Sequence, residues 1–171
     1  MTGESLCAEC GLCCNGTFFA QITLRSDEEV ARVEGRGLVV LRKTGRTVLP
    51  LPCPQHSGTA CCIYEDRPEV CAEYRCWLLR DVDSTKVSFE DAVRSIARLK
   101  EIAATIQTAL DFDVRGQPLF DAAVAFFEAN DTIDARRRHG AVLLDMAEFL
   151  QIARRRFGIQ TDDPPAESSP N

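Results

Sequence analysis

Apolar residues in the second half of the chain recur with the spacing of amphipathic helices. Spacings of three and four run along residues 96–109, and Ser88 is a suitable N-cap for this helix. After a glycine and a proline, the pattern predicts further helices over 118–129 and 131–158, the last ending at a glycine. This half should therefore form three helices that pack through their apolar faces.

Shorter patterns of strand and turn residues fill the first half. Residues 17–24 are predicted to form a strand, and Ser26 is a suitable N-cap for a helix over 27–34. Residues 39–41 and 47–49 flank a Lys-Thr-Gly-Arg turn, which indicates a small hairpin. These elements bury too little surface to be stable alone, so a further stabilising element is expected.

Together the patterns predict an α+β protein. We expect a small cysteine-rich, metal-stapled module of short strands and helices over residues 1–80, then about three packed helices over 81–159. Residues 160–171 contain three prolines and three acids, which is typical of a disordered tail.

Composition narrows the function classes. The formal net charge of -6 disfavours electrostatic binding of the whole chain to nucleic acid or to an anionic membrane. No secretory leader and no apolar run of membrane-spanning length is present, so we expect a soluble cytoplasmic protein. Because cytoplasmic thiols stay reduced, the nine cysteines indicate metal ligation rather than disulfides.

All nine cysteines lie between Cys7 and Cys76, and the chain opens with a C-x-x-C-x-x-C-C motif. Two-residue gaps in a tight loop over residues 7–15 would present successive sulfurs to one metal centre. The neighbouring side chains of Cys13 and Cys14 should diverge. This doublet therefore indicates two metals, a polynuclear cluster, or one thiol that is not a ligand.

A second motif follows, in which Cys53-Pro54 precedes Cys61-x-Ile-Tyr-x-x-Arg-Pro-x-x-Cys71. With the opening motif, it resembles the YkgJ-type cysteine-cluster family of zinc- or iron-chelating proteins over residues 5–80. Cys62 and Cys76 lie outside the matched motif. We choose Cys76 as a ligand, because it follows Cys71 by a helical turn and a residue on a helix predicted to run to Leu79. The predicted metal ligands are Cys7, Cys10, Cys13, Cys14, Cys53, Cys61, Cys71 and Cys76.

These residues predict a metal-binding protein that holds an iron–sulfur cluster or zinc, with no catalytic residue assigned. The all-cysteine ligand set and the doublet favour the polynuclear iron–sulfur centre. Some proteins with similar cysteine motifs are linked to methylation of flagellin lysines, so the resemblance also implies part of a protein-modifying enzyme as an alternative. Another alternative is an interaction module, in which zinc is structural and the helices dock a protein partner or nucleic acid.

Several charged residues have two interpretations. Arg67 is expected to offset thiolate charge beside the ligands, whereas Arg75 has equal claims to that role and to a surface ion pair. His56 is a less favoured ligand, since enough thiolates are present without it. The arginine triplets 136–138 and 154–156 would point the same way on a continuous helix; they could contact phosphates or a protein, but a solvated helix face is favoured.

Overall fold

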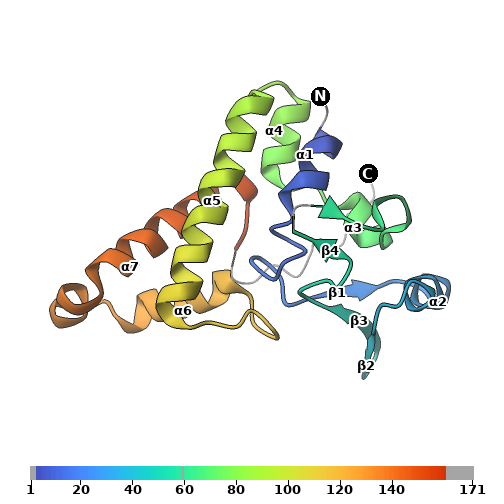
Figure 1. Ribbon diagram of the computed structural model, residues 1–171, viewed down its shortest axis with the longest axis horizontal. Helices are drawn as coiled ribbons and strands as arrows, with labels where there is room; N and C mark the ends of the chain where they lie inside the picture. The colour runs from blue at the N-terminus through green and yellow to red at the C-terminus, as the bar shows by residue number, and fades with distance from the viewer. Residues whose placement is uncertain (1–2, 59, 161–171) are drawn as a thin grey trace.

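The computed structural model describes residues 3–58 and 60–160, and it confirms the mixed architecture (Figure 1). Long helices form one side of the molecule, and short strands with two short helices form the other. The helical side contains α4 (Trp77–Asp83), α5 (Phe89–Leu110), α6 (Leu119–Ala129), α7 (Ile133–Ile152) and a π-helical turn, η2 (Ala153–Phe157). None of the described helices is long and apolar enough to cross a bilayer.

The N-terminal half begins with a helix and then forms small antiparallel sheets. The elements of this half are α1 (Gly3–Cys10), β1 (Gln21–Leu24), α2 (Asp27–Gly35), β2 (Leu41–Lys43), β3 (Arg46–Pro50), β4 (His56–Ser57), β5 (Ala60–Cys61), the 3-10 turn η1 (Tyr64–Asp66) and α3 (Glu69–Glu73). Strand order in the larger sheet is β1-β3-β2, with Ile22 opposite Leu49.

The predicted helix starts are confirmed by their caps. Ser26 Oγ accepts from the Glu29 amide at 3.1 Å at the start of α2, and Ser88 Oγ accepts from the Asp91 amide at 3.1 Å at the start of α5. Thr132 caps α7 in the same way. Each cap satisfies an amide that has no partner within its helix, so the start of the helix is determined locally.

The predicted helix over 131–158 is wrong in its interior. His139 has non-helical dihedrals (φ -118, ψ 18), and the last turn before Gly158 is π-helical. Gly158 ends the helix at φ 73, where a Cβ would lie 2.7 Å from the Trp77 ring. Because the helix is not regular, residue spacing alone no longer places the two arginine triplets on one face.

The other local predictions are partly wrong. The hairpin is confirmed, with Lys43 opposite Arg46, but the strand predicted over 17–24 begins only at Gln21. The Thr17 amide bonds to the Asn15 side chain, and the Thr17 carbonyl accepts from α6. These bonds replace the ladder bonds that a longer strand would need.

Two segments around the cysteines also differ from prediction. Residues 7–10 belong to α1 rather than to a loop, because Leu6 of this helix is buried in the core. The helix predicted to reach Leu79 is two helices, since Tyr74 is extended (φ -62, ψ 123) and packs edge-on against Phe19. Cys76 is consequently the N-cap of α4, and it does not share a helix with Cys71.

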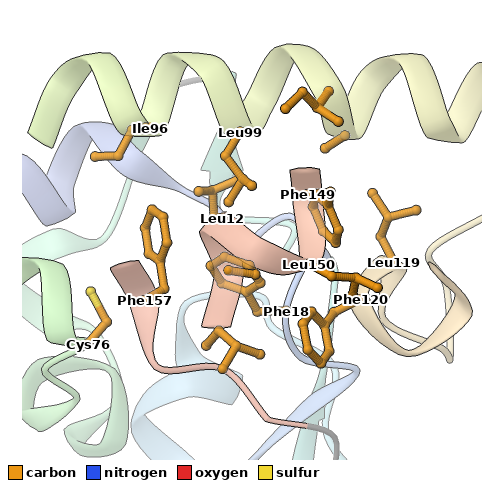
Figure 2. Packing of buried hydrophobic residues seen from close by; sticks show 14 of the residues in the cluster. Leu12, Phe18, Cys76, Ile96, Leu99, Leu119, Phe120, Phe149, Leu150 and Phe157 are labelled. Carbon is orange, nitrogen blue, oxygen red and sulfur yellow. The ribbon is translucent and has the colours of Figure 1, made fainter. Parts of the chain in front are cut away.

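Two hydrophobic clusters form the interior. The larger one joins α5, α6 and α7 to α1, α4 and the cysteine loop, and Figure 2 shows Leu12 and Phe18 of that loop among the helical side chains. The Phe18 and Phe157 ring centroids are 5.2 Å apart. The smaller cluster comprises Ile22, Leu24, Val30, Val33, Leu38, Val40, Leu49, Leu51, Ile63 and Val70. Cysteines pack against both clusters, so the thiols lie at the junction between them.

Glu29 is a fully buried acidic residue that joins α2 to α3. Its two carboxylate oxygens accept from the Arg25 amide and from the Glu69 amide, each at 2.6 Å. Glu69 is the first residue of α3, so its amide lacks a partner within the helix. Glu29 therefore fixes the start of the helix that carries Cys71.

Replacing Glu29 by alanine should destabilise the fold by about 2–5 kcal/mol, because it leaves two buried amides without acceptors. The midpoint and slope of urea unfolding measure this change. Glu34→Ala is the control, since Glu34 forms only an exposed pair with Arg42 and should cost less than about 1 kcal/mol. Equal losses in the two variants would contradict the role given to Glu29.

Candidate metal centre

Cysteines from three separate segments of the chain interact with one another. α1 and the loop after it supply four thiols, the β4–β5 region supplies two, and α3 with the start of α4 supplies two. The Cys53 amide donates to the Cys14 carbonyl at 2.8 Å, which ties the second segment to the first. The side chains are those of Cys7, Cys10, Cys13, Cys14, Cys53, Cys61, Cys71 and Cys76.

Gly11 lets the opening loop pass close to the second segment. It has a φ of 71, which disfavours any other residue, and a Cβ there would collide with the His56 ring. His56 Nε2 is buried against this glycine without a hydrogen-bond partner. Burial, followed by the charge of Lys100, lowers the pKa of His56.

The electrostatic interactions among the thiols form two overlapping groups. Cys13 interacts with Cys10 and Cys76, whereas its neighbour Cys14 interacts with Cys53 and Cys61. Cys7 interacts with members of both groups. Cys71 interacts most strongly with Cys14 among the other thiols. The strongest thiol partners of Cys13 and of Cys14 therefore differ, although these two thiols also interact with each other.

A cavity of about 80 Å³ lies among the thiols. Its wall is otherwise apolar and aromatic, with one guanidinium, that of Arg67. Six cysteines line it, from both groups: Cys7, Cys13, Cys14, Cys53, Cys61 and Cys71. This volume is several times the cavity volume that one water molecule needs. The cysteine side chains therefore surround an open space and do not converge on one point.

Burial raises the pKa of most of these thiols. It raises the pKa of Cys10 and of Cys14 to about 12 and that of Cys76 to about 11. The pKa values of Cys13, Cys53 and Cys71 are also raised, again chiefly by burial. At neutral pH these thiols are therefore protonated when no cation is near, and a bound cation would have to displace the protons.

Within residues 3–58 and 60–160, no three histidine, cysteine or acidic side chains converge closely enough to hold a single ion as placed. The donor chemistry nevertheless fits a soft metal, because six of the side chains around the cavity are thiols. Arg67 Nε is buried without an acceptor beside these thiols. An anionic metal–thiolate centre would provide that acceptor.

Arg67 is held in place from its own turn. Its guanidinium carbon lies 3.7 Å from the centre of the Tyr64 ring, and Nη1 donates to the Tyr64 carbonyl at 2.7 Å. Arg75 instead forms an ion pair with Asp83 at 3.2 Å, which accords with the surface interpretation. Cys62 is exposed, and it does not line the cavity.

Sequence reasoning missed Glu29 and the contact between Gly11 and His56. Glu29 stands three residues after the N-cap Ser26, where a capping box would place it, so a local role could have been found. Its bond to the Glu69 amide, 40 positions away, has no signal in the sequence.

The thiol-lined centre defines a metal-chelating protein of the cysteine-cluster class. A family model described as "CxxCxxCC: Putative zinc- or iron-chelating domain" matches residues 6–101, and the chain belongs to this family. The recognition made from the motifs is confirmed, and the match extends beyond residue 80 into α5. Searches of curated proteins and of solved structures find no match.

Proposed function

We propose that this protein holds a polynuclear iron–sulfur centre through two adjoining sets of four thiolates. The first set is Cys7, Cys10, Cys13 and Cys76, and the second is Cys14, Cys53, Cys61 and Cys71. The observation that carries the proposal is the cavity lined by six of these thiols from both sets. When bound, such a centre supplies one-electron transfer or structural cross-linking.

The size of the cavity supports a cluster over a single ion. Four thiolates around one zinc ion close to about 2.3 Å from the metal and leave no space of water size between them. Inorganic sulfide and several irons would fill the space of about 80 Å³ that lies among the thiols. Cys10 and Cys76 are buried, so their thiols are shielded from water.

Positive charge beside the thiols supports a negatively charged metal–thiolate centre. Arg67 Nε–H would donate to a thiolate or sulfide, which would satisfy its missing bond. The charge of Lys100 acts on Cys10 and lowers its pKa against the larger effect of burial. Two cations near the thiols would offset part of the charge of a metal–thiolate centre.

Two structural zinc ions are the second candidate. The two proposed sets of four thiols match the ligand number of structural zinc, and each set could close around one ion. Arg67 and Lys100 would compensate charge equally in this case.

Metal and sulfide analysis of anaerobically purified protein, with a visible spectrum, tests the proposal. An iron–sulfur centre predicts iron and acid-labile sulfide in similar amounts and broad visible absorption that bleaches with dithionite. A colourless protein with about two zinc ions per chain would replace the cluster with the second candidate. Protein that binds neither metal after anaerobic reconstitution would overturn metal binding through these thiols.

Metal affinity should rise with pH. The pKa values of Cys10 and Cys14 are raised from 9.0 to about 12, so protons compete with the metal throughout the neutral range. Apparent affinity, measured in competition with a chromophoric chelator of known proton affinity, is expected to increase at each step from pH 6.5 to 8.5. An affinity that did not change with pH would mean that protonated thiols are not the ligands.

A further inference from the structure

A groove runs along the seam between α6 and α7, away from the thiols. Two hollows of about 380 and 510 Å³ form it, and they share Phe127 and Ala147. The first hollow is lined by Phe127, Asn130, Asp131, Arg136, Gly140, Leu143, Leu144 and Ala147. The second continues along the same two helices as far as Arg154 and Arg155. The hollows adjoin at the residues they share, and together they are called the groove.

Small residues of α7 line part of the groove. Gly140 and Ala147 are seven positions apart on α7, and a Cβ added to Gly140 would meet no atom within 4 Å. Large apolar side chains stand on its walls: Leu144 is 73% exposed and Phe127 is 37% exposed. Exposed apolar side chains that gather around a hollow are typical of a binding surface.

The length of the groove suits a helix. After the break at His139 it extends over the turns of α7 and η2 from Gly140 to Arg155, about 22 Å at about 1.5 Å per residue. A helix of about 15 residues has the same length. A helix that binds in a groove presents a row of apolar residues at three- and four-residue spacing. In this groove, that row would contact Phe127 and Leu144.

The charges differ between the two ends. Asp131 and Arg136 neutralise each other at one end through an ion pair. At the other end Arg154 and Arg155 form no ion pair within the described part of the chain, and only one carboxylate, Glu128, lines the same hollow. Arg154 also lies over the Phe120 ring at 5.8 Å, which orients its side chain. This end is therefore positive and complements an acidic group.

We propose that the groove binds an amphipathic helix of a partner protein. The apolar stripe of that helix lies on Phe127 and Leu144, and acidic residues at one of its ends meet Arg154 and Arg155. The apolar walls favour a protein over nucleic acid, because phosphates would gain nothing from Leu144 or Phe127. Neither the thiols nor their metal takes part, so this inference is independent of the proposed function.

The test uses the full metal-loaded chain and a labelled synthetic peptide of about 15 residues. The peptide carries leucines at three- and four-residue spacing, glutamates at one end, and neutral polar residues elsewhere. Fluorescence anisotropy should show saturable binding that weakens at high salt. The double variant Arg154→Gln, Arg155→Gln and the variant Gly140→Leu, which fills the groove, should each bind at least tenfold more weakly.

Matched controls separate the groove from general stickiness. Gly140→Ala keeps the groove open and suits a helix, so it should bind as the unchanged protein does. Leu41→Gln removes an exposed apolar residue elsewhere and should also have no effect. Circular dichroism and urea midpoints establish that each variant is folded.

Several results would overturn the proposal. These are no saturable binding, equal binding of a scrambled peptide or of one with lysine for glutamate, and unchanged binding by Gly140→Leu. Self-association of the chain that Gly140→Leu abolishes and that excludes the peptide would assign the groove to a second copy instead.

Discussion

Cys61→Ser is expected to lose most of its metal, whereas Cys62→Ser, one position along the chain, should retain it. Cys61 lines the cavity and interacts with Cys14 and Cys71, so its loss removes a thiolate from the second set. Serine is a much poorer ligand for a soft metal. Cys62 is exposed, and its change leaves the set complete. Metal per chain after identical anaerobic purification measures the difference.

The same pair of variants should differ in stability. Because metal binding contributes to folding free energy, Cys61→Ser should also lower the urea midpoint, whereas Cys62→Ser should leave it within error. Cys62 lies close enough to Cys53 to raise the pKa of that thiol. The result to look for against this prediction is therefore that Cys62, and not Cys61, is the metal ligand. Metal loss in Cys62→Ser with retention in Cys61→Ser would reverse the assignment.

Metal removal should unfold the side of the molecule built on the smaller hydrophobic cluster. That cluster has ten buried residues on short strands and helices, and the thiols of Cys53, Cys61 and Cys71 pack against it. A structural metal site contributes on the order of 10 kcal/mol to the free energy of folding, which is comparable with the whole free energy of unfolding of a domain. Hydrogen exchange should therefore show protection lost over β1 to α3 and kept in α5, α6 and α7.

The control for this experiment is chelator that has been saturated with metal beforehand, which should leave exchange unchanged. Adding metal back under reducing conditions should restore protection. The helical cluster is larger and includes fully buried Phe120, Phe149 and Met146, so it should remain folded. Unchanged exchange over residues 21–73 after complete metal removal would show that the metal is not structural.

α1 and α4 provide a finer readout of the same experiment. Both helices pack in the larger cluster, yet they carry Cys7, Cys10 and Cys76. Figure 2 shows Cys76 beside Phe157, within the helical core. These helices should lose less protection than α3 does, because apolar burial holds them after the first set of thiols has lost its metal.

Local features of this protein were predictable from its sequence. Ser26, Ser88 and Thr132 cap the helices that the sequence predicts, and the turn before Arg46 forms the expected hairpin. Caps and tight turns depend on side chains within a few residues, so neighbouring positions contain the whole signal. The cysteine motifs likewise sufficed to recognise the family.

Only the tertiary structure decided how these pieces meet. α1 forms where a loop was predicted because Leu6 is buried by distant helices, and the chain breaks at Tyr74 because that ring packs on Phe19. The contacts of Cys13 with Cys76 and of Cys14 with Cys53, the surroundings of Arg67 Nε, and the bond from Glu29 to the Glu69 amide all involve distant segments. Such contacts depend on packing between elements, which local residue patterns do not encode.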